Sequence, residues 1–438
     1  MGYLPNLRRL TLAATEKRLY VLIVLLLCGC IVVGLIADGP TDALRGLLRI
    51  QSHPARLLND FTVIGGEGAA LINAACVALI GLALVRITSV RLSGPTIAAV
   101  FTMLGFGLFG KTLVNALPII AGVTIAARIA GASFREYILI ALFGTALGPL
   151  VMALAVETGL ATPLAFASAI GGGIVAGIVL PPVAIAMLRL HQGFNLYNIG
   201  LTSGFIAVFA ASLLVAAGGD LSSQLIVNTA ASPVLVFLVP GISLVLIVAG
   251  SLAGPAAAFK DLVRIAGLPG RLPSDFVSMV SVHGSLVNMG AMGLLSWGYI
   301  VLIGGQIDGP ILGAMLTIVG FAAFGKHPRN SWPVLAGVVI ACLVFGKDLT
   351  APGPKLAALF ALTLAPLAGE FGWYTGIIAG FIHLVMVERT GAWHLGINLY
   401  NNGFAGGLTA TLLVAIIEWF RSNRTGGPQQ AQSRGRLR

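Results

Sequence analysis

Residues 94–131 read GPTIAAVFTMLGFGLFGKTLVNALPIIAGVTIAARIAG, and residues 309–346 read GPILGAMLTIVGFAAFGKHPRNSWPVLAGVVIACLVFG. The two stretches align without a gap at an offset of 215 positions. A colinear series of matches at one spacing indicates an internal repeat, so the chain is predicted to contain two copies of one structural unit. Further matches at the same offset are Asp60-Phe61 with Asp275-Phe276, and Asn73 with Asn288.

The second part of each copy is marked by the tetrapeptide NLYN, at 195–198 and again at 398–401. Its offset is 203, because the first copy holds an insertion between Pro149 and Gly173. We predict one membrane repeat at 1–218, a second at 232–421, and a disordered, basic, cytoplasmic tail at 422–438.

The composition places both copies in a lipid bilayer. Of the 438 residues, 57% are hydrophobic and 9% are charged, and the mean hydropathy is +0.98, whereas a soluble domain carries about a quarter charged residues. Apolar runs long enough for a helix to cross the hydrocarbon core recur from residue 19 to residue 420. A bilayer leaves no water to satisfy open backbone groups, so we expect an all-α integral membrane protein.

The number of crossings sets the relative orientation of the copies. Each copy shows seven apolar segments, and an odd number of crossings turns the second copy upside down, which gives the inverted-topology repeat of many secondary transporters. Most of the 26 basic residues then fall on one side, which places both termini in the cytoplasm of a bacterial inner (cytoplasmic) membrane. Topology thus accounts for the net charge of +11, and no nucleic-acid partner is expected. Amphipathic stretches at 42–57 and 258–272 are predicted to lie at the interfaces.

The first candidate site is the FGK motif, at 109–111 and 324–326. The apolar arms around each motif are shorter than the roughly 20 residues of a full crossing, which favours a re-entrant hairpin and leaves five crossings per copy. Lysines and helix N-termini at the tips would favour an anion. The alternative is two full crossings joined by ordinary loops. As hairpin tips, the motifs would bring four polar residues near the centre of the membrane: Lys111, Asn115, Lys326 and Asn330.

The second candidate site is the polar run around NLYN. Buried amides cost about 1–3 kcal/mol when they lack a partner, so this run suits a broken helix whose amides bind one another, the backbone or a solute. The alternative is that its side chains cap helices and join them. The predicted substrate-binding residues here are Asn195, Tyr197, Asn198, Asn398, Tyr400 and Asn401.

The third candidate is a pair of ionisable residues inside apolar segments. Glu67 and His283 occupy nearly equivalent positions in the two copies, and intramembrane ionisable groups usually face a cavity or a partner. They are predicted to couple transport to protons. The alternative for Glu67 is an interfacial position near the start of its helix.

Sequence motifs for several kinds of enzyme chemistry are absent. The sequence contains no phosphate-binding G-x-x-x-x-G-K-[ST] loop, no H-E-x-x-H zinc motif and no nucleophile–base pair within a motif. We therefore expect neither an enzyme nor an ATP-driven pump, with no cofactor and no metal site.

The paired H-x-G-x-N-L-Y-N-x-G and F-G-K-x-x-x-N-x-x-P blocks resemble an uncharacterised family of bacterial polytopic membrane proteins, a domain of unknown function with two internal repeats. The chain is also similar to urea transporters, which have two inverted halves of five helices and a Tyr-Asn-Gly element. This sequence has Ile199 and Asn402 where that glycine would follow.

These features predict a secondary transporter of a small polar, anionic solute that works by alternating access between inverted repeats. One alternative is a passive channel for a small neutral solute, as the likeness to urea transporters implies. Another is a non-catalytic membrane subunit that needs a partner. The expected partners are the lipid bilayer and a small-molecule or ion substrate, and the 57 glycines would permit close helix contact in a homo-oligomer.

Overall fold

The chain folds as a bundle of helices. The computed structural model describes residues 4–54, 56–219, 221, 225–230, 232–252 and 254–424, and every regular element in these ranges is helical. Nine helical segments in the described part are long and apolar enough to cross a bilayer. The prediction of an all-α, multi-pass membrane protein is confirmed. The predicted tail begins inside the last helix, and its residues 425–438 lie outside the described part.

The helices follow the same order in both repeats. The first repeat contains α1 (Leu4–Ser52), α2 (Phe61–Ile64), α3 (Glu67–Ile87), α4 (Gly94–Phe106), α5 (Leu113–Ile129), α6 (Phe134–Gly144), η1 (Thr145–Leu147), α7 (Gly148–Val156), α8 (Thr162–His191) and α9 (Asn198–Ala216). The second contains α10 (Pro233–Ser251), α11 (Pro255–Ile265), α12 (Phe276–Met279), α13 (Val282–Leu302), α14 (Gly309–Phe321), α15 (Pro328–Val344), α16 (Pro352–Phe360), η2 (Ala361–Leu364), α17 (Ala365–Phe371), α18 (Trp373–Trp393) and α19 (Asn401–Arg424).

Helix α1 contains a sharp bend. Gly39 has φ 73° and ψ 157°, a backbone conformation that glycine adopts without a steric penalty, and Pro40 lacks the N–H that would continue the helix. The bend separates a crossing segment from the amphipathic segment that the sequence predicts. In the second repeat, α10 and α11 take these two places as separate helices, and α11 ends at Ile265, before the predicted end at residue 272.

Helices α4 and α5 form the two arms of a re-entrant hairpin. Gly107, just after α4, packs on Ala74 in the first half of α3, and Met103 of α4 contacts Gly81 further along α3, so α4 runs antiparallel to α3. Helix α5 then packs along α6 and α7, and α3 and α6 meet where Gly81 faces Leu142. Both ends of the stretch 94–129 therefore lie on one side. Each repeat thus contains one hairpin and five long helical segments. Nine of these ten segments are the apolar ones counted above, and the tenth, α18, takes the place in the second repeat that α8 has in the first.

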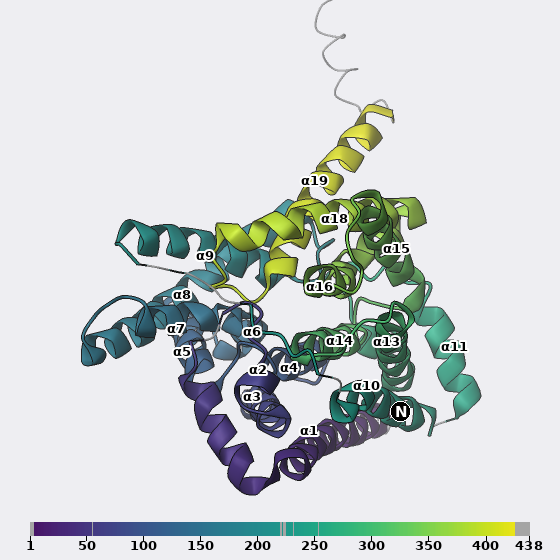
Figure 1. Ribbon diagram of the computed structural model, residues 1–438. Coiled ribbons are helices and arrows are strands. Elements are labelled where there is room, and N and C mark those ends of the chain that lie inside the picture. Colours follow the sequence, from purple (N-terminus) through teal and green to yellow (C-terminus); the bar gives the residue numbers. More distant parts are fainter. Residues whose placement is uncertain are drawn as a thin grey trace, which may run out of the picture.

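The antiparallel packing of α4 on α14 shows that the repeats are inverted. Gly105 lies against the backbone of Gly313, and the equivalent pair, Gly320 and Ala98, makes the same close approach. The two helices lie side by side at the centre of the molecule (Figure 1). The twofold axis that exchanges two antiparallel helices is perpendicular to both of them. The second repeat is therefore upside down relative to the first.

Asp60, which is buried, and Asp275, which is partly buried, repeat this symmetry at the ends of the helix pair. The backbone N–H of Gly94 donates to Oδ1 of Asp275 at 2.9 Å. The N–H of Gly309 donates to Oδ2 of Asp60 at 3.1 Å. Each repeat thus caps the first turn of the other repeat's central helix, where backbone N–H groups lack a partner within the helix.

The helices assemble into two groups that each draw on both repeats. Helices α1–α4 pack with α10–α14, and we call them the α4 group. Helices α5–α9 pack with α15–α19, and we call them the α9 group. The hairpin tips at 107–112 and 322–327 connect the groups. Each repeat is therefore divided between two bodies, which its sequence pattern does not reveal.

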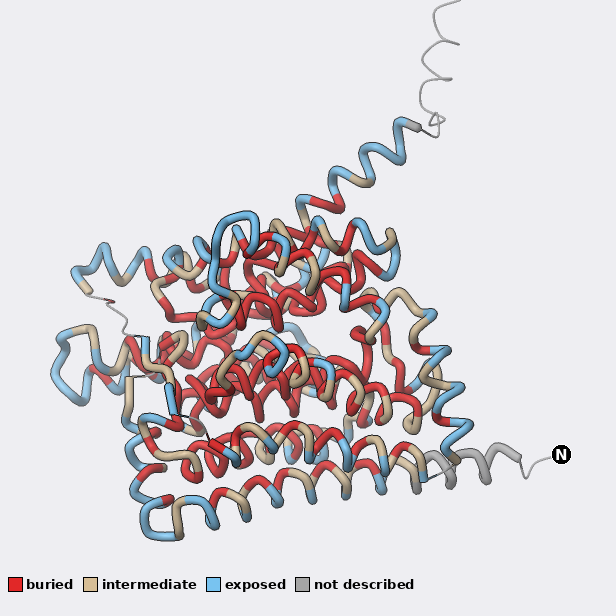
Figure 2. The backbone as a smooth tube through the Cα atoms, turned by 45° about the vertical axis from the view of Figure 1, so that its right-hand side comes forward, coloured by how far each residue is buried: buried red, intermediate tan, exposed pale blue. Residues whose placement is uncertain are grey.

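Buried residues concentrate in the interior of the bundle, and the outer segments carry most of the exposed residues (Figure 2). The exposed side chains on α1, α8 and α10 include large apolar ones, such as Leu25, Phe166 and Phe237. A soluble protein would place charged residues there. An apolar outer surface indicates that these helices face lipid, as in a membrane-embedded bundle.

Candidate functional site

The first hairpin tip is shaped by its own polar residues. Helix α4 ends at Phe106, and Gly110 takes φ 103°. The hydroxyl of Thr112 accepts from the N–H of Asn115, and Oδ1 of Asn115 accepts from the N–H of Thr112. The Asn115 amide also donates to the Gly110 carbonyl at 2.8 Å. Asn115 therefore fixes the turn that carries Lys111, and its predicted part in substrate binding stays a prediction.

The second hairpin tip is built in the same way as the first, except that one capping residue differs. His327 replaces the capping threonine, and its Nδ1 accepts from the N–H of Asn330. The Asn330 amide donates to the Gly325 carbonyl at 3.0 Å and to the Pro269 carbonyl. Asn330 is therefore also a residue that shapes the tip, and Lys326 is the side chain that the turn presents.

A buried asparagine on the neighbouring crossing helix holds each tip in place. Asn73 donates to the carbonyls of Gly107 and Lys111 at 2.7 and 2.9 Å. Asn288 donates to the carbonyls of Ala322 and Lys326 at 2.7 and 2.8 Å. The sequence offset pairs these two asparagines but does not reveal their partners.

The Asn288→Leu variant is expected to lower the free energy of unfolding by about 2–3 kcal/mol, because two buried carbonyls lose their donor. Thermal denaturation in detergent measures the change. Asn423→Leu, at an exposed position near the end of α19, is the matched control. Equal melting temperatures for both variants would show that the tip does not depend on Asn288.

Each lysine reaches a tyrosine of the other repeat. Nζ of Lys111 donates to the hydroxyl of Tyr400 at 2.5 Å, and Nζ of Lys326 donates to the hydroxyl of Tyr197 at 2.5 Å. Both lysines are 0% exposed. The FGK and NLYN motifs, which the sequence offers as two separate candidates, therefore form one pair of symmetry-related sites.

Aromatic rings surround the two ammonium groups. Nζ of Lys111 lies 4.7 Å from the ring centre of Tyr400, and Nζ of Lys326 lies 4.5 Å from that of Tyr197. The rings of Phe106 and Phe321 add a second face to each. Such contacts contribute on the order of 2 kcal/mol when desolvated.

Neither lysine makes an ion pair within the described residues. A buried ion without a counter-charge costs several kcal/mol, which exceeds what one aromatic contact returns. Each tyrosine hydroxyl accepts from a lysine, so its own proton remains free to donate. The arrangement suits a negatively charged group that arrives at the two tyrosines.

The asparagines of the NLYN segments mainly order their own chain. Oδ1 of Asn195 accepts from the N–H of Tyr197, and Oδ1 of Asn398 accepts from the N–H of Tyr400. Asn198 and Asn401 each donate to a carbonyl of the preceding long helix and pair with a histidine. Of the six predicted residues, the two tyrosines and Asn198 line the cavity described next.

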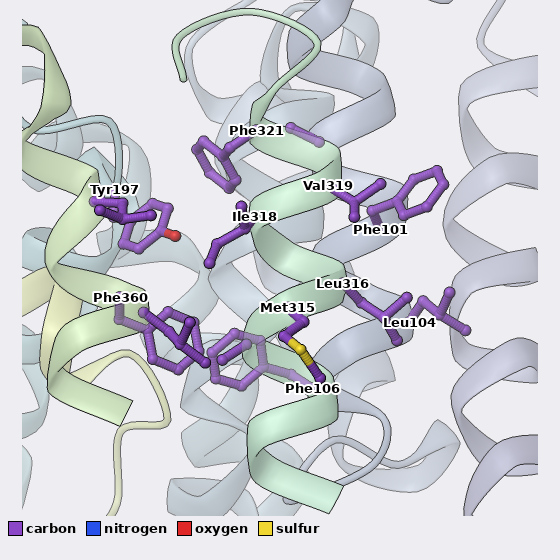
Figure 3. Packing of buried hydrophobic residues seen from close by; sticks show 14 of the residues in the cluster. Phe101, Leu104, Phe106, Tyr197, Met315, Leu316, Ile318, Val319, Phe321 and Phe360 are labelled. Atoms are coloured by element: carbon purple, nitrogen blue, oxygen red, sulfur yellow. The ribbon is translucent and has the colours of Figure 1, made fainter. Parts of the chain in front are cut away.

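A cavity of about 620 Å³ lies between the α4 group and the α9 group. Its lining contains equivalent residues of both repeats, among them Thr102 with Thr317 and Tyr197 with Tyr400. Figure 3 shows Tyr197, Phe360, Phe106 and Phe321 gathered on one side of α14. The centres of the Phe106 and Phe360 rings are 5.5 Å apart. The cavity thus includes the tyrosines that the lysines hold.

The cavity reaches only one face. Arg189, Gln192 and the segment 272–274 form its rim, and Nε of Arg271 donates to the Gln192 carbonyl nearby. We call this side the Arg271 face. The equivalents of the segment 272–274 on the other side are residues 57–59, and they do not line the cavity. We call that side the Arg56 face.

Buried ion pairs join the two groups at the Arg56 face. Arg56 pairs with Glu157 and donates to the Pro149 carbonyl at 3.2 Å. Lys355 pairs with Asp308 at 3.4 Å. Burial lowers the pKa of Arg56 to about 10 and raises the pKa of Asp308 to about 6, so Arg56 and Asp308 are both predominantly charged at neutral pH.

The two residues predicted to couple protons lie away from the cavity. Glu67 is the first residue of α3 and accepts from the hydroxyl of Ser232 at 2.6 Å. His283 is the second residue of α13. Both are partly exposed at helix starts, which agrees with the interfacial alternative for Glu67 and corrects the expectation of positions inside the span. Their part in ion coupling stays a prediction.

The repeats differ at the cavity in a way that the sequence offset conceals. Leu196 donates to the Thr363 carbonyl, and Leu399 donates to the Ala146 carbonyl, so Thr363 and Ala146 are equivalent. Oγ1 of Thr363 also donates to Oδ1 of Asn195 at 2.5 Å, a bond that alanine cannot make. The NLYN segment of the first repeat is therefore tied more firmly than that of the second.

A family model described as "Protein of unknown function (DUF1576)" matches residues 39–216 and 254–419. The two matched regions coincide with the two repeats. No curated protein and no solved structure matches the chain.

Proposed function

We propose that this chain, which belongs to the DUF1576 family of proteins of unknown function, is a secondary transporter of a small anionic solute. The observation that carries this proposal is the cavity between the two helix groups, whose lining extends to the Arg271 face, whereas buried ion pairs join the two groups at the Arg56 face. A passive channel would need a path through both faces.

Two buried lysines that have no counter-ion among the described residues support the choice of an anion. They stand behind the hydroxyls of Tyr197 and Tyr400, which line the cavity. A negative group at these hydroxyls would offset the cost of burying the ammonium groups, so binding and charge neutralisation would occur together.

The division into groups supports movement of the α9 group against the α4 group, in place of one whole repeat against the other. The hairpin tips that carry the lysines connect the groups and would act as hinges. Because the repeats are inverted, exchanging their conformations would close the Arg271 face and open the Arg56 face. With the termini in the cytoplasm, the described state is open to the cytoplasm.

Uptake into proteoliposomes tests the proposal. We expect saturable uptake of a labelled anion and counterflow when the lumen is preloaded with the unlabelled anion. A dependence on an imposed pH gradient would identify proton coupling. Linear flux without counterflow would contradict a carrier and favour a channel, and no flux of any anion would favour a subunit that needs a partner.

The Glu157→Gln variant is expected to open the Arg56 face at least tenfold more often, because Arg56 loses the charge that holds it, a change of about 1.4 kcal/mol. A cysteine placed at Thr102 in a background without other cysteines reports the opening through labelling by an impermeant maleimide from that side. Glu388→Gln, which breaks the exposed pair with Lys347, is the control. Equal labelling in both variants would contradict a gate at Arg56.

A further inference from the structure

We propose that the solute is an amphipathic organic anion, and that it enters the cavity sideways from the bilayer through a gap between α6 and α8. This inference rests on the proposed function and adds the chemical class of the solute and its route.

The cavity lining calls for an apolar body. Five phenylalanines line it: Phe106, Phe143, Phe321 and Phe360, from α4, α6, α14 and α16, and Phe324 from the second hairpin tip. A small, fully hydrated ion would leave this aromatic surface in contact with water. An apolar body would cover it, and small-molecule sites of roughly 300–1,000 Å³ are typically lined in this way.

The charge of the lining excludes a cation. Within the described part of the chain, no acidic residue lines the cavity, and Arg189 is the only charged residue that does. Arg189 stands at the rim, whereas the tyrosines and the lysines behind them lie deeper. A carboxylate could pass from the arginine to the tyrosine hydroxyls while its apolar body lies among the phenylalanines.

The rim itself borders lipid on one side. Ile185 and Leu188 of α8 line the cavity and are 53% and 40% exposed. Leu139 and Ile140 of α6 line it opposite them. Other apolar residues of α8, such as Val175 and Leu190, are exposed without lining the cavity, so this helix borders the hydrocarbon core and the gap between α6 and α8 opens to the bilayer. Arg189, one residue beyond Leu188, would meet a headgroup at the interface.

Binding of straight-chain carboxylates tests the class of solute. Titration calorimetry would compare butanoate, hexanoate, octanoate and decanoate on protein in nanodiscs, with empty nanodiscs subtracted. We expect the affinity to rise about three- to fourfold for each added methylene until the body fills the cavity. Octylammonium, which has the same body and the opposite charge, should bind at least tenfold more weakly than octanoate.

The route is tested by narrowing the gap. Ile185→Trp should slow the binding of decanoate at least fivefold and leave butanoate, which can enter from the aqueous rim, unchanged. Leu190→Trp is the matched control, because Leu190 is exposed on the same helix and does not line the cavity. Equal rates in the two variants would overturn lateral entry.

The outcomes separate the inference from the proposed function. If butanoate or phosphate binds and is transported as well as decanoate, the transporter stands and the amphipathic solute is wrong. If octylammonium binds as tightly as octanoate, the anionic headgroup is wrong. If no anion binds and none is transported, the proposed function fails together with the inference.

Discussion

Replacing Lys111 by methionine is expected to weaken anion binding about 10- to 100-fold, because a hydrogen bond to a charged group contributes about 1.5–3 kcal/mol. Lys326→Met should act alike through Tyr197, and the double variant should abolish saturable uptake. Methionine retains most of the length and apolar volume of the lysine, so the packing around Tyr400 is preserved.

Thermal stability distinguishes a binding role for Lys111 from a structural one. A buried ammonium without a counter-ion is costly, so methionine should leave the melting temperature unchanged or raise it. Lys260→Met, at an exposed position on α11, controls for the loss of a positive charge. A Lys111→Met protein that melts much lower, or one that binds anions within twofold of the wild type, would contradict the site.

Replacing Gly105 by leucine is expected to prevent folding. A Cβ there would overlap the carbonyl oxygen of Gly313 and come within 3.0 Å of the Thr317 hydroxyl. Backbone cannot move aside as a flexible side chain does, so the loss should reach or exceed the top of the roughly 1–3 kcal/mol range for overpacking.

Size-exclusion chromatography and thermal denaturation measure the effect of Gly105→Leu. Gly298→Leu is the matched control, since Gly298 lies in helix α13 and a Cβ there meets nothing within 4 Å. If Gly105→Leu gave the yield and melting temperature of the control, α4 and α14 would not form the close pair on which the inverted arrangement depends.

The architecture was predictable because it rests on periodic and repeated features. Hydropathy indicated a helical membrane protein, the 215-residue offset indicated two copies, and the short arms around Lys111 indicated a hairpin. The family match over both repeats and the helical structure confirm the fold class. The division into two groups was not predictable, since it depends on which helices pack together rather than on what each contains.

The sequence indicated individual residues of the candidate site, but it did not show which of them meet in the folded chain. The repeat offsets singled out Lys111 and Tyr400 separately, yet no sequence pattern shows that a residue at 111 meets one at 400. The structural role of the asparagines was not predictable, because an amide that turns the backbone looks the same in sequence as one that binds a solute, and their part in binding stays a prediction. The match of Asn73 with Asn288 at the offset is the sequence signal for the two residues that hold the tips, but it does not show which carbonyls they bind.

The near-perfect exchange symmetry around α4 and α14 has an energetic consequence. When two inverted copies trade conformations, every contact present in both copies is lost on one side and regained on the other, so it contributes nothing to the preference for either facing state. Only positions at which the two repeats carry different residues or contacts can determine which side of the membrane the empty carrier faces. Thr363 opposite Ala146, and the ion pairs of Arg56 and Lys355, are such positions, and exchanging them between the copies should reverse which side of the membrane the empty carrier faces.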